Sequence, residues 1–173
     1  VYDYYINLNQ LFMVEKLNFA VLQTNIIWEN PISNLKEYTD TIKTIDKNSD
    51  AILLPEMFNT GFSMNIKKTA EEMTGETVNW MKKTALKHKT PVAGTLAIKE
   101  GGDVYNRFVW ANPDQTLKHY DKRHCFSYAG EDKVFKKGKK QIIIDLKGWK
   151  IFPQICYDLR FPVWSRNTMR YDV

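Results

Sequence analysis

The stretch LNFAVLQTNIIWENPISNLKEYTDTIKTIDKNSDAILL, residues 17–54, decides the fold class. Its first part, residues 17–27, is an apolar run that predicts a buried strand. Asn30-Pro31 is a helix-start signal, and apolar residues then recur every three or four positions, as in an amphipathic helix: Ile32, Leu35, Tyr38, Ile42 and Ile45. A second apolar strand, residues 51–54, ends at Pro55. Strand, helix and strand in this order are typical of a parallel unit, so we predict an α/β fold.

The rest of the chain continues this pattern and adds antiparallel strands. We expect a helix over residues 76–88, with Val78, Met81 and Ala85 on one face. Strands are expected at residues 91–98 and 104–111, joined by a Gly101-Gly102-Asp103 turn, and at residues 117–120. Two further strands, residues 141–146 and 150–156, flank a Lys147-Gly148 turn. We find no internal repeat and no linker, so one domain is predicted.

Composition restricts the function classes. The 173 residues are 43% hydrophobic, which is typical of a folded chain, and no apolar run approaches the roughly 20 residues of a membrane helix. We therefore expect no membrane partner. No secretory signal is recognised, and the two cysteines form no CxxC pair, so a reduced, cytoplasmic location is expected. The three histidines do not fall at zinc-ligand spacing, which predicts no metal site.

The charge of +5 and five lysines between positions 133 and 140 raise the alternative of a nucleic-acid binder. No aromatic or glycine-rich recognition pattern accompanies these lysines, so a solvated turn is the favoured interpretation and no nucleic-acid partner is expected. The ends of the chain are unusual. Residues 1–12 are interpreted as a non-native or disordered extension before Met13, and residues 13–173 as the N-terminal part of a single domain of a longer protein.

Three chemically active side chains follow apolar strands: Glu56 after AILLP, Lys122 after LKHYD and Cys156 after IFPQI. In open α/β sheets, ligands bind beyond the carboxyl ends of strands. A thiol attacks only after losing its proton, which a carboxylate can accept and an ammonium or a helix N-terminus can favour. An ammonium can also stabilise an oxyanion. Each residue alone has a simpler interpretation, as a core cysteine, a turn cap or a surface lysine, and spacing does not prove that the three meet.

The sequence around these residues resembles the carbon–nitrogen hydrolases of the nitrilase superfamily. LLPEMF contains the family's glutamate (Glu56), YDKRHCF its lysine (Lys122) and ICYDLRFP its cysteine (Cys156). The resemblance runs from about residue 18 to the C-terminus. It implies an α-β-β-α sandwich, incomplete here at its C-terminus, that hydrolyses carbon–nitrogen bonds through a thioester without a cofactor.

The resemblance also implies roles for further residues. Glu131 matches a second glutamate that helps align substrate and lysine, and we favour this role over the alternative of a surface acid. Substrate-positioning roles are implied for Phe62, Tyr157 and Trp164, and local support of the cysteine turn for Asp158 and Arg160. Cys125 occupies a place where the family has an aliphatic residue, so we interpret it as a core residue.

PEMFNTGFSM and CYDLRFPVWSRN look most like the ω-amidase branch, which hydrolyses the terminal amide of 2-oxo acid amides such as 2-oxoglutaramate or 2-oxosuccinamate. Another nitrilase-type amidase, an N-carbamoyl hydrolase and an inactive interaction module remain alternatives. The resemblance implies a homodimer for the full-length parent. Because the family's domain continues past Val173, we expect the 173-residue chain alone to be poorly stable or inactive.

Overall fold

A five-stranded mixed sheet forms the centre of the molecule in the computed structural model, which describes residues 16–168 and 170–173. Its spatial order is β1 (Phe19–Val21), β2 (Ala51–Leu53), β3 (Val92–Glu100), β4 (Asp103–Ala111) and β5 (Leu117–Asp121). The first three strands are parallel, and β3, β4 and β5 are antiparallel neighbours. The predicted parallel unit and the predicted hairpin are therefore both present. The proposed extension over residues 1–12 lies outside the described residues.

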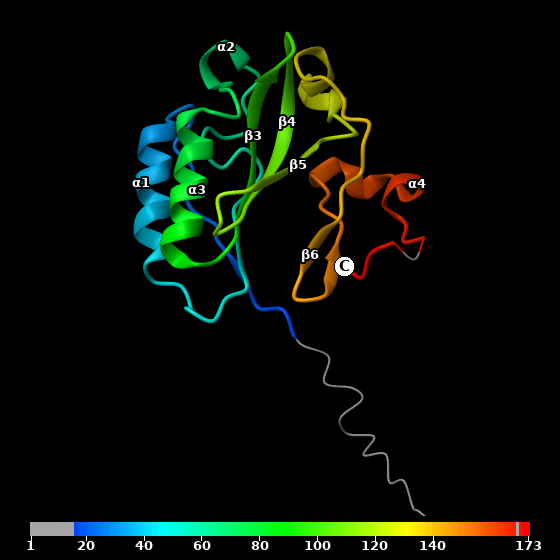
Figure 1. Cartoon of the computed structure of the whole chain (residues 1–173). Coiled ribbons are helices and arrows are strands. Elements are labelled where there is room, and N and C mark those ends of the chain that lie inside the picture. Colours follow the sequence, from blue (N-terminus) through cyan, green and yellow to red (C-terminus); the bar gives the residue numbers. More distant parts are fainter. Residues whose placement is uncertain (1–15, 169) are drawn as a thin grey trace, which may run out of the picture.

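Two helices cover one face of this sheet, α1 (Pro31–Ile42) and α3 (Glu76–His88), as Figure 1 shows. The Asn30 side chain accepts a hydrogen bond from Ser33 N at 3.1 Å and so caps α1, as the sequence signal predicted. The predicted face of α3 is fully buried against the sheet. The expectation for Ile32 was wrong: this side chain is 77% exposed, because it lies in the first turn of α1, outside the contact with the sheet.

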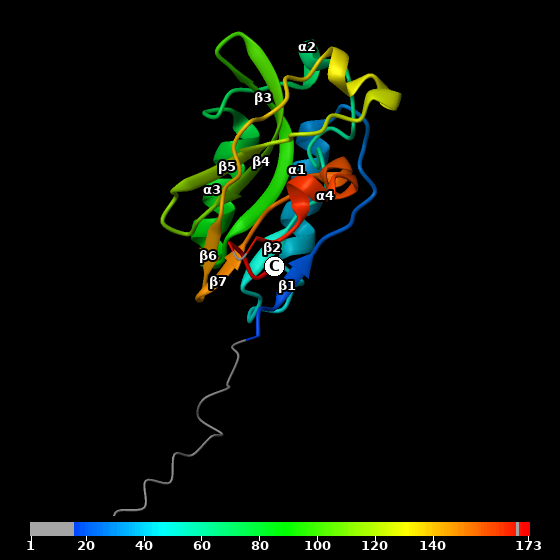
Figure 2. The same ribbon diagram turned by 90° about the vertical axis from the view of Figure 1, so that its right-hand side faces the viewer.

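A two-stranded sheet lies on the opposite face, formed by β6 (Ile144–Leu146) and β7 (Trp149–Ile151). Ile144 packs against Trp110, Ala93 and Ala51 of the large sheet, so a second core separates the two sheets. Figures 1 and 2 show the resulting order of helices, sheet and sheet. This arrangement agrees with the first three layers of the predicted sandwich.

Short helical turns lie between the strands and after the last one: α2 (Ile66–Thr69), η2 (Ser127–Ala129), η3 (Glu131–Lys133), η4 (Cys156–Arg160) and α4 (Pro162–Ser165). The strand predicted to end at Cys156 stops at Ile151. Pro153, which has no N–H, follows closely, and Cys156 begins a 3-10 turn instead. The strand predicted over residues 17–27 is likewise limited to Phe19–Val21.

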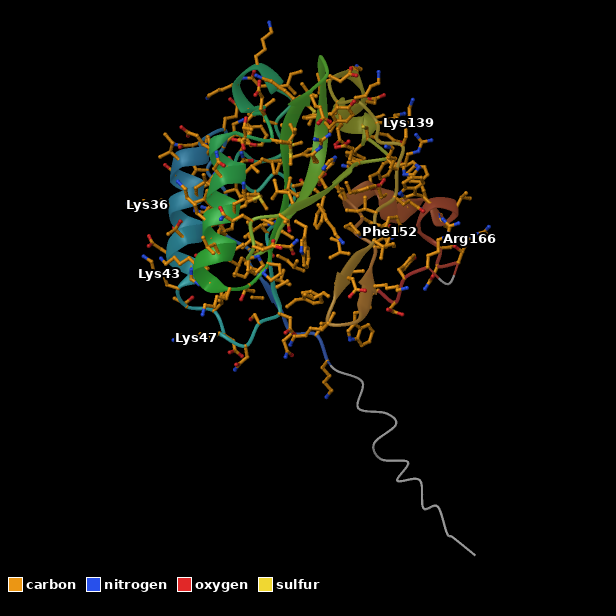
Figure 3. All side chains as sticks on the ribbon, viewed as in Figure 1. Lys36, Lys43, Lys47, Lys139, Phe152 and Arg166 are labelled. Atoms are coloured by element: carbon orange, nitrogen blue, oxygen red, sulfur yellow. The ribbon has the colours of Figure 1, made fainter. Side chains whose placement is uncertain are left out.

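The lysine-rich segment lines a surface cleft of about 700 Å³ beside the exposed edge of β5, together with Lys118 and His119. Its lysine side chains are exposed, and Figure 3 shows Lys139 pointing away from the molecule. Among the described residues, no helix is both long and apolar enough to cross a membrane.

Candidate active site

Glu56 lies in the loop that follows β2, and this loop is fixed to β3. Met57, fully buried and at φ +49°, donates its N–H to Thr95 Oγ1 at 2.9 Å. The Phe58 ring covers Gly94, where any Cβ would lie 2.8 Å from that ring. These contacts hold the loop in one position, so the Glu56 carboxylate enters the site from a rigid support.

Lys122 follows β5 and is held from both sides by backbone hydrogen bonds. Its N–H donates to Asn106 O at 3.0 Å, and its carbonyl accepts from Gly138 N at 2.8 Å. The side chain is 1% exposed, with Nζ 2.7 Å from Glu56 Oε1 and 2.9 Å from Glu131 Oε2. Burial alone lowers the pKa of Lys122, but the two carboxylates outweigh it and raise the pKa above its ordinary value. The lysine is therefore an ammonium.

Glu131 is a buried residue, which excludes the alternative of a surface acid. It begins the η3 turn, and its side chain is fully inaccessible. Besides Lys122 Nζ, its carboxylate accepts hydrogen bonds from Phe126 N at 2.5 Å and Asn106 Nδ2 at 2.8 Å. The sequence-predicted pairing of Glu131 with Lys122 is thus present in the structure.

Cys156 is the first residue of η4 and has φ +44°, a conformation that non-glycine residues rarely adopt. Although Cys156 is exposed, desolvation raises the pKa of its thiol, the charge of Glu56 raises it further, and Lys122 opposes them. The sequence argument emphasised the ammonium and a helix N-terminus, which favour a thiolate. In the structure the effects of desolvation and of the Glu56 carboxylate, which raise the thiol pKa, outweigh that of Lys122, which lowers it.

Asp158 supports the turn that carries Cys156. Its fully buried carboxylate accepts hydrogen bonds from Ile155 N at 3.1 Å, Tyr120 Oη at 2.7 Å and His124 N at 2.9 Å, and His124 Nδ1 lies 2.9 Å away. The local support predicted for Asp158 is therefore present. Its partners are Ile155, Tyr120 and His124, whereas Arg160 is exposed.

The sequence profile of the carbon-nitrogen hydrolase family matches residues 18–172. The chain belongs to this family. It is 39% identical over 157 residues to an omega-amidase of Yersinia enterocolitica and 35% identical over 155 residues to a 2-oxoglutaramate amidase of Bacillus subtilis. These alignments cover 91% and 88% of this chain, which spans about 60% of the length of either relative.

Solved structures support the same assignment. A CN-hydrolase superfamily protein of Xanthomonas campestris is 38% identical and superposes with a TM-score of 0.84, over 87% of this chain and 57% of that one. Nit3 of Saccharomyces cerevisiae, a nitrilase superfamily member, has a TM-score of 0.72 at 24% identity, over 86% of this chain and 58% of that one. The α/β fold of this chain is therefore the fold of these proteins.

The three aromatic residues predicted to position substrate differ in location. The Phe62 ring lies 5.3 Å from Lys122 Nζ, inside the site. Tyr157, next to Cys156, packs edge-on against Phe126 and Phe161. Trp164 donates Nε1 to Tyr120 Oη at 3.0 Å, so its contacts belong to the network beneath the cysteine turn.

Sequence reasoning missed Asn106, which bonds both glutamates from the middle of β4, and its neighbour Arg107. Asn106 is 1% exposed between the apolar positions Val104 and Phe108 on the same strand face. A polar residue at such a position signals a buried hydrogen-bonding role. Arg107, on the other face, is fully buried and bonds Asp121, the residue before Lys122, through Nε at 2.6 Å.

The second cysteine and the question of a metal complete the site. Cys125 is 6% exposed and packs with Met57, Ala97 and Phe135, and burial raises the pKa of its thiol to about 11. This placement agrees with its interpretation as a core residue.

Within the described ranges, no three histidine, cysteine or acidic side chains gather as a metal site. The grouped side chains offer a thiol, a proton acceptor and a fixed positive charge, which suit nucleophilic attack on a carbonyl.

Proposed function

We propose that the protein hydrolyses the terminal amide of a small 2-oxo acid amide, 2-oxoglutaramate or 2-oxosuccinamate, to the acid and ammonia. The observation that carries the proposal is the position of Lys122 Nζ between Glu56 and Glu131, with the charge of Glu56 acting on the Cys156 thiol. The names of the two relatives described above support the choice of substrate.

The first half of the proposed reaction forms a thioester. As Cys156 Sγ bonds to the amide carbon, Glu56 accepts the thiol proton and the carbonyl becomes an oxyanion. Lys122 has three N–H groups, of which two bond the glutamates, and the third is available to the oxyanion. The C–N bond then breaks, and the leaving nitrogen takes the proton from Glu56 and departs as ammonia.

The second half returns the enzyme to its starting state. Water attacks the thioester carbon while Glu56 again accepts a proton. The C–S bond breaks, the proton returns to the Cys156 sulfur, and the carboxylic acid leaves. Because the pKa of the thiol is raised, a base is needed in the first half, and Glu56 is the carboxylate whose charge acts on that thiol most strongly.

Ammonia release from a substrate panel tests this proposal. The panel contains 2-oxoglutaramate, 2-oxosuccinamate, glutamine and an N-carbamoyl amine, and the variants are Cys156→Ala and, as a matched control, Cys125→Ala. We expect turnover of the 2-oxo acid amides, lost in Cys156→Ala and kept in Cys125→Ala. Faster turnover of the N-carbamoyl amine would overturn the substrate assignment. Absence of turnover, with Cys156 no more reactive than a free cysteine and indifferent to Lys122, would favour a non-catalytic module.

The proposal extends to assembly and partners. We propose a homodimer for the full-length parent and no nucleic-acid partner. Light scattering of the purified protein tests the first point, and a monomer at all concentrations would contradict it. Salt-sensitive binding of DNA or RNA through the exposed lysines would contradict the second.

A further inference from the structure

Asn106 connects every charged group of the candidate site. Its single amide nitrogen lies 2.7 Å from Glu56 Oε1 and 2.8 Å from Glu131 Oε1, so each of its two hydrogens serves one carboxylate. Its backbone carbonyl accepts the N–H of Lys122 at 3.0 Å. Asn106 itself is fixed within β4, opposite Ala97 of β3, in the longest strand pair of the sheet. Asn106 therefore contacts both glutamates and Lys122 from one fixed position in the sheet.

The hydrogen bonds distinguish the two glutamates. Both oxygens of Glu131 are engaged, Oε1 by Asn106 and Oε2 by Lys122 and Phe126 N. In Glu56, Asn106 and Lys122 both bond Oε1. The Oε2 atom of Glu56 takes part in neither of these bonds, so it is the oxygen left to accept a proton. Glu131 therefore holds Lys122 and Asn106 in place. Glu56 is held through one oxygen and can act as a base through the other.

The charges explain why a neutral amide suits this position. Two carboxylates share one ammonium in a largely buried site, and like charges at close range repel one another. An amide donates to each carboxylate without adding charge. The Oδ1 atom of Asn106 is buried with no hydrogen-bond partner among the described residues, so the amide is oriented by the two carboxylates alone. Leaving a buried acceptor unpaired is costly, and the two hydrogen bonds donated by the amide nitrogen offset this cost.

We propose that Asn106 is a positioning residue of the amidase reaction, which holds Glu56 and Glu131 together and assigns Oε2 of Glu56 as the proton acceptor. This inference rests on the proposed function. Asn106 contacts neither the thiol nor, in the proposed chemistry, the reacting carbon. Its effect on rate therefore passes through the position of Glu56 and Lys122.

Two substitutions separate positioning from folding. Asn106→Leu removes both N–H donors at similar volume, and Asn106→Asp replaces them with a third carboxylate that can donate only when protonated. Asn112→Asp, just beyond β4, is the matched control for the added charge. Each variant is compared with the unchanged protein in kcat and KM for 2-oxoglutaramate from acidic to alkaline pH, in its thermal melt, and in the rate at which iodoacetamide labels Cys156.

We expect kcat of Asn106→Leu to fall roughly 10- to 100-fold with KM changed less than about twofold, because the groups are displaced but substrate contacts remain. Asn106→Asp should match this loss at alkaline pH and recover relative to Asn106→Leu as the pH falls. Asn112→Asp should behave like the unchanged protein. Unchanged kcat in Asn106→Leu, or parallel pH profiles of the two Asn106 variants, would overturn the proposal. If Asn106→Leu fails to melt cooperatively, the pH profile of Asn106→Asp decides.

Labelling of Cys156 keeps this test independent of the substrate. Glu56 raises the pKa of the thiol, so a displaced Glu56 should let Asn106→Leu label nearly as fast as Glu56→Gln. If the unchanged protein hydrolyses no amide but this labelling pattern appears, the proposed function fails and the role of Asn106 stands. If amides are hydrolysed and Asn106→Leu labels like the unchanged protein, the role of Asn106 fails alone.

Discussion

Replacing Asp158 by asparagine tests how the cysteine turn is held. The carboxylate is fully buried and receives donors on both oxygens: Ile155 N and Tyr120 Oη on Oδ2, and the His124 backbone N–H and ring nitrogen on Oδ1. Asparagine has the same shape but only one oxygen. In either orientation of the amide, its NH₂ group faces a backbone N–H that donated a hydrogen bond to the carboxylate. Two donors then face each other, and that hydrogen bond is lost.

The cost follows from the hydrogen bonds lost. One buried donor left unpaired costs about 1–3 kcal/mol, and the remaining bonds lose the strength that the negative charge gave them. Together these effects lower the free energy of unfolding by roughly 2–4 kcal/mol. For a chain of this size, each kcal/mol shifts Tm by about 2–4 °C, so we expect Tm to fall by roughly 4–16 °C. Cys156, at φ +44° two residues before Asp158, should also lose its fixed position.

Circular dichroism melting of Asp158→Asn, with the exposed Asp145→Asn as the matched control, measures this effect. Asp145 lies on β6 with its side chain in solvent, so the control should melt within about 1 °C of the unchanged protein. Amide turnover of Asp158→Asn should fall even at temperatures where it is folded. If Asp158→Asn melted and turned over substrate like the control, our account of the cysteine turn would be refuted.

Three other substitutions test separate parts of the account. Gly138→Ala should destabilise the protein by more than about 2 kcal/mol in urea unfolding, because its Cβ would lie 2.0 Å from Asp121 O, and a shift below 0.5 kcal/mol would contradict this. In Glu56→Gln, iodoacetamide should label Cys156 faster at neutral pH, because removing the carboxylate lowers the pKa of that thiol, and amide turnover should be lost. Slower labelling would contradict the conclusion that Glu56 raises the thiol pKa. Cys125→Ala should retain turnover, since this thiol is buried in the core, and complete loss of ammonia release would assign it a role in the site.

Local patterns predicted most of the architecture. The helix expected over residues 76–88 matches α3 at both ends, because its apolar spacing and a left-handed C-cap at Lys89 agree. The strand at residues 17–27 was predicted too long, because an apolar run does not show where pairing with β2 ends, and pairing stops after Val21. The strand predicted to end at Cys156 was also too long, because a sequence pattern does not show where strand pairing stops, and β7 ends at Ile151.

The candidate site was predictable in part. Motif resemblance identified Glu56, Lys122 and Cys156, and the structure brings them together. The balance of charge at the thiol could not be predicted, because it depends on burial and on the distance to Glu56. Asn106 was also missed, since its importance lies in two hydrogen bonds to residues 50 and 25 positions away in the sequence.

The central claim is that Cys156 carries the acyl group during amide hydrolysis, and acid-quenched mass spectrometry during turnover of 2-oxoglutaramate tests it directly. We predict a covalent adduct with the mass of the substrate less ammonia, located on the peptide containing Cys156. The adduct should be absent from Cys156→Ala, which should also release no ammonia. Ammonia release that survives in Cys156→Ala, or an adduct on Cys125, would contradict the account.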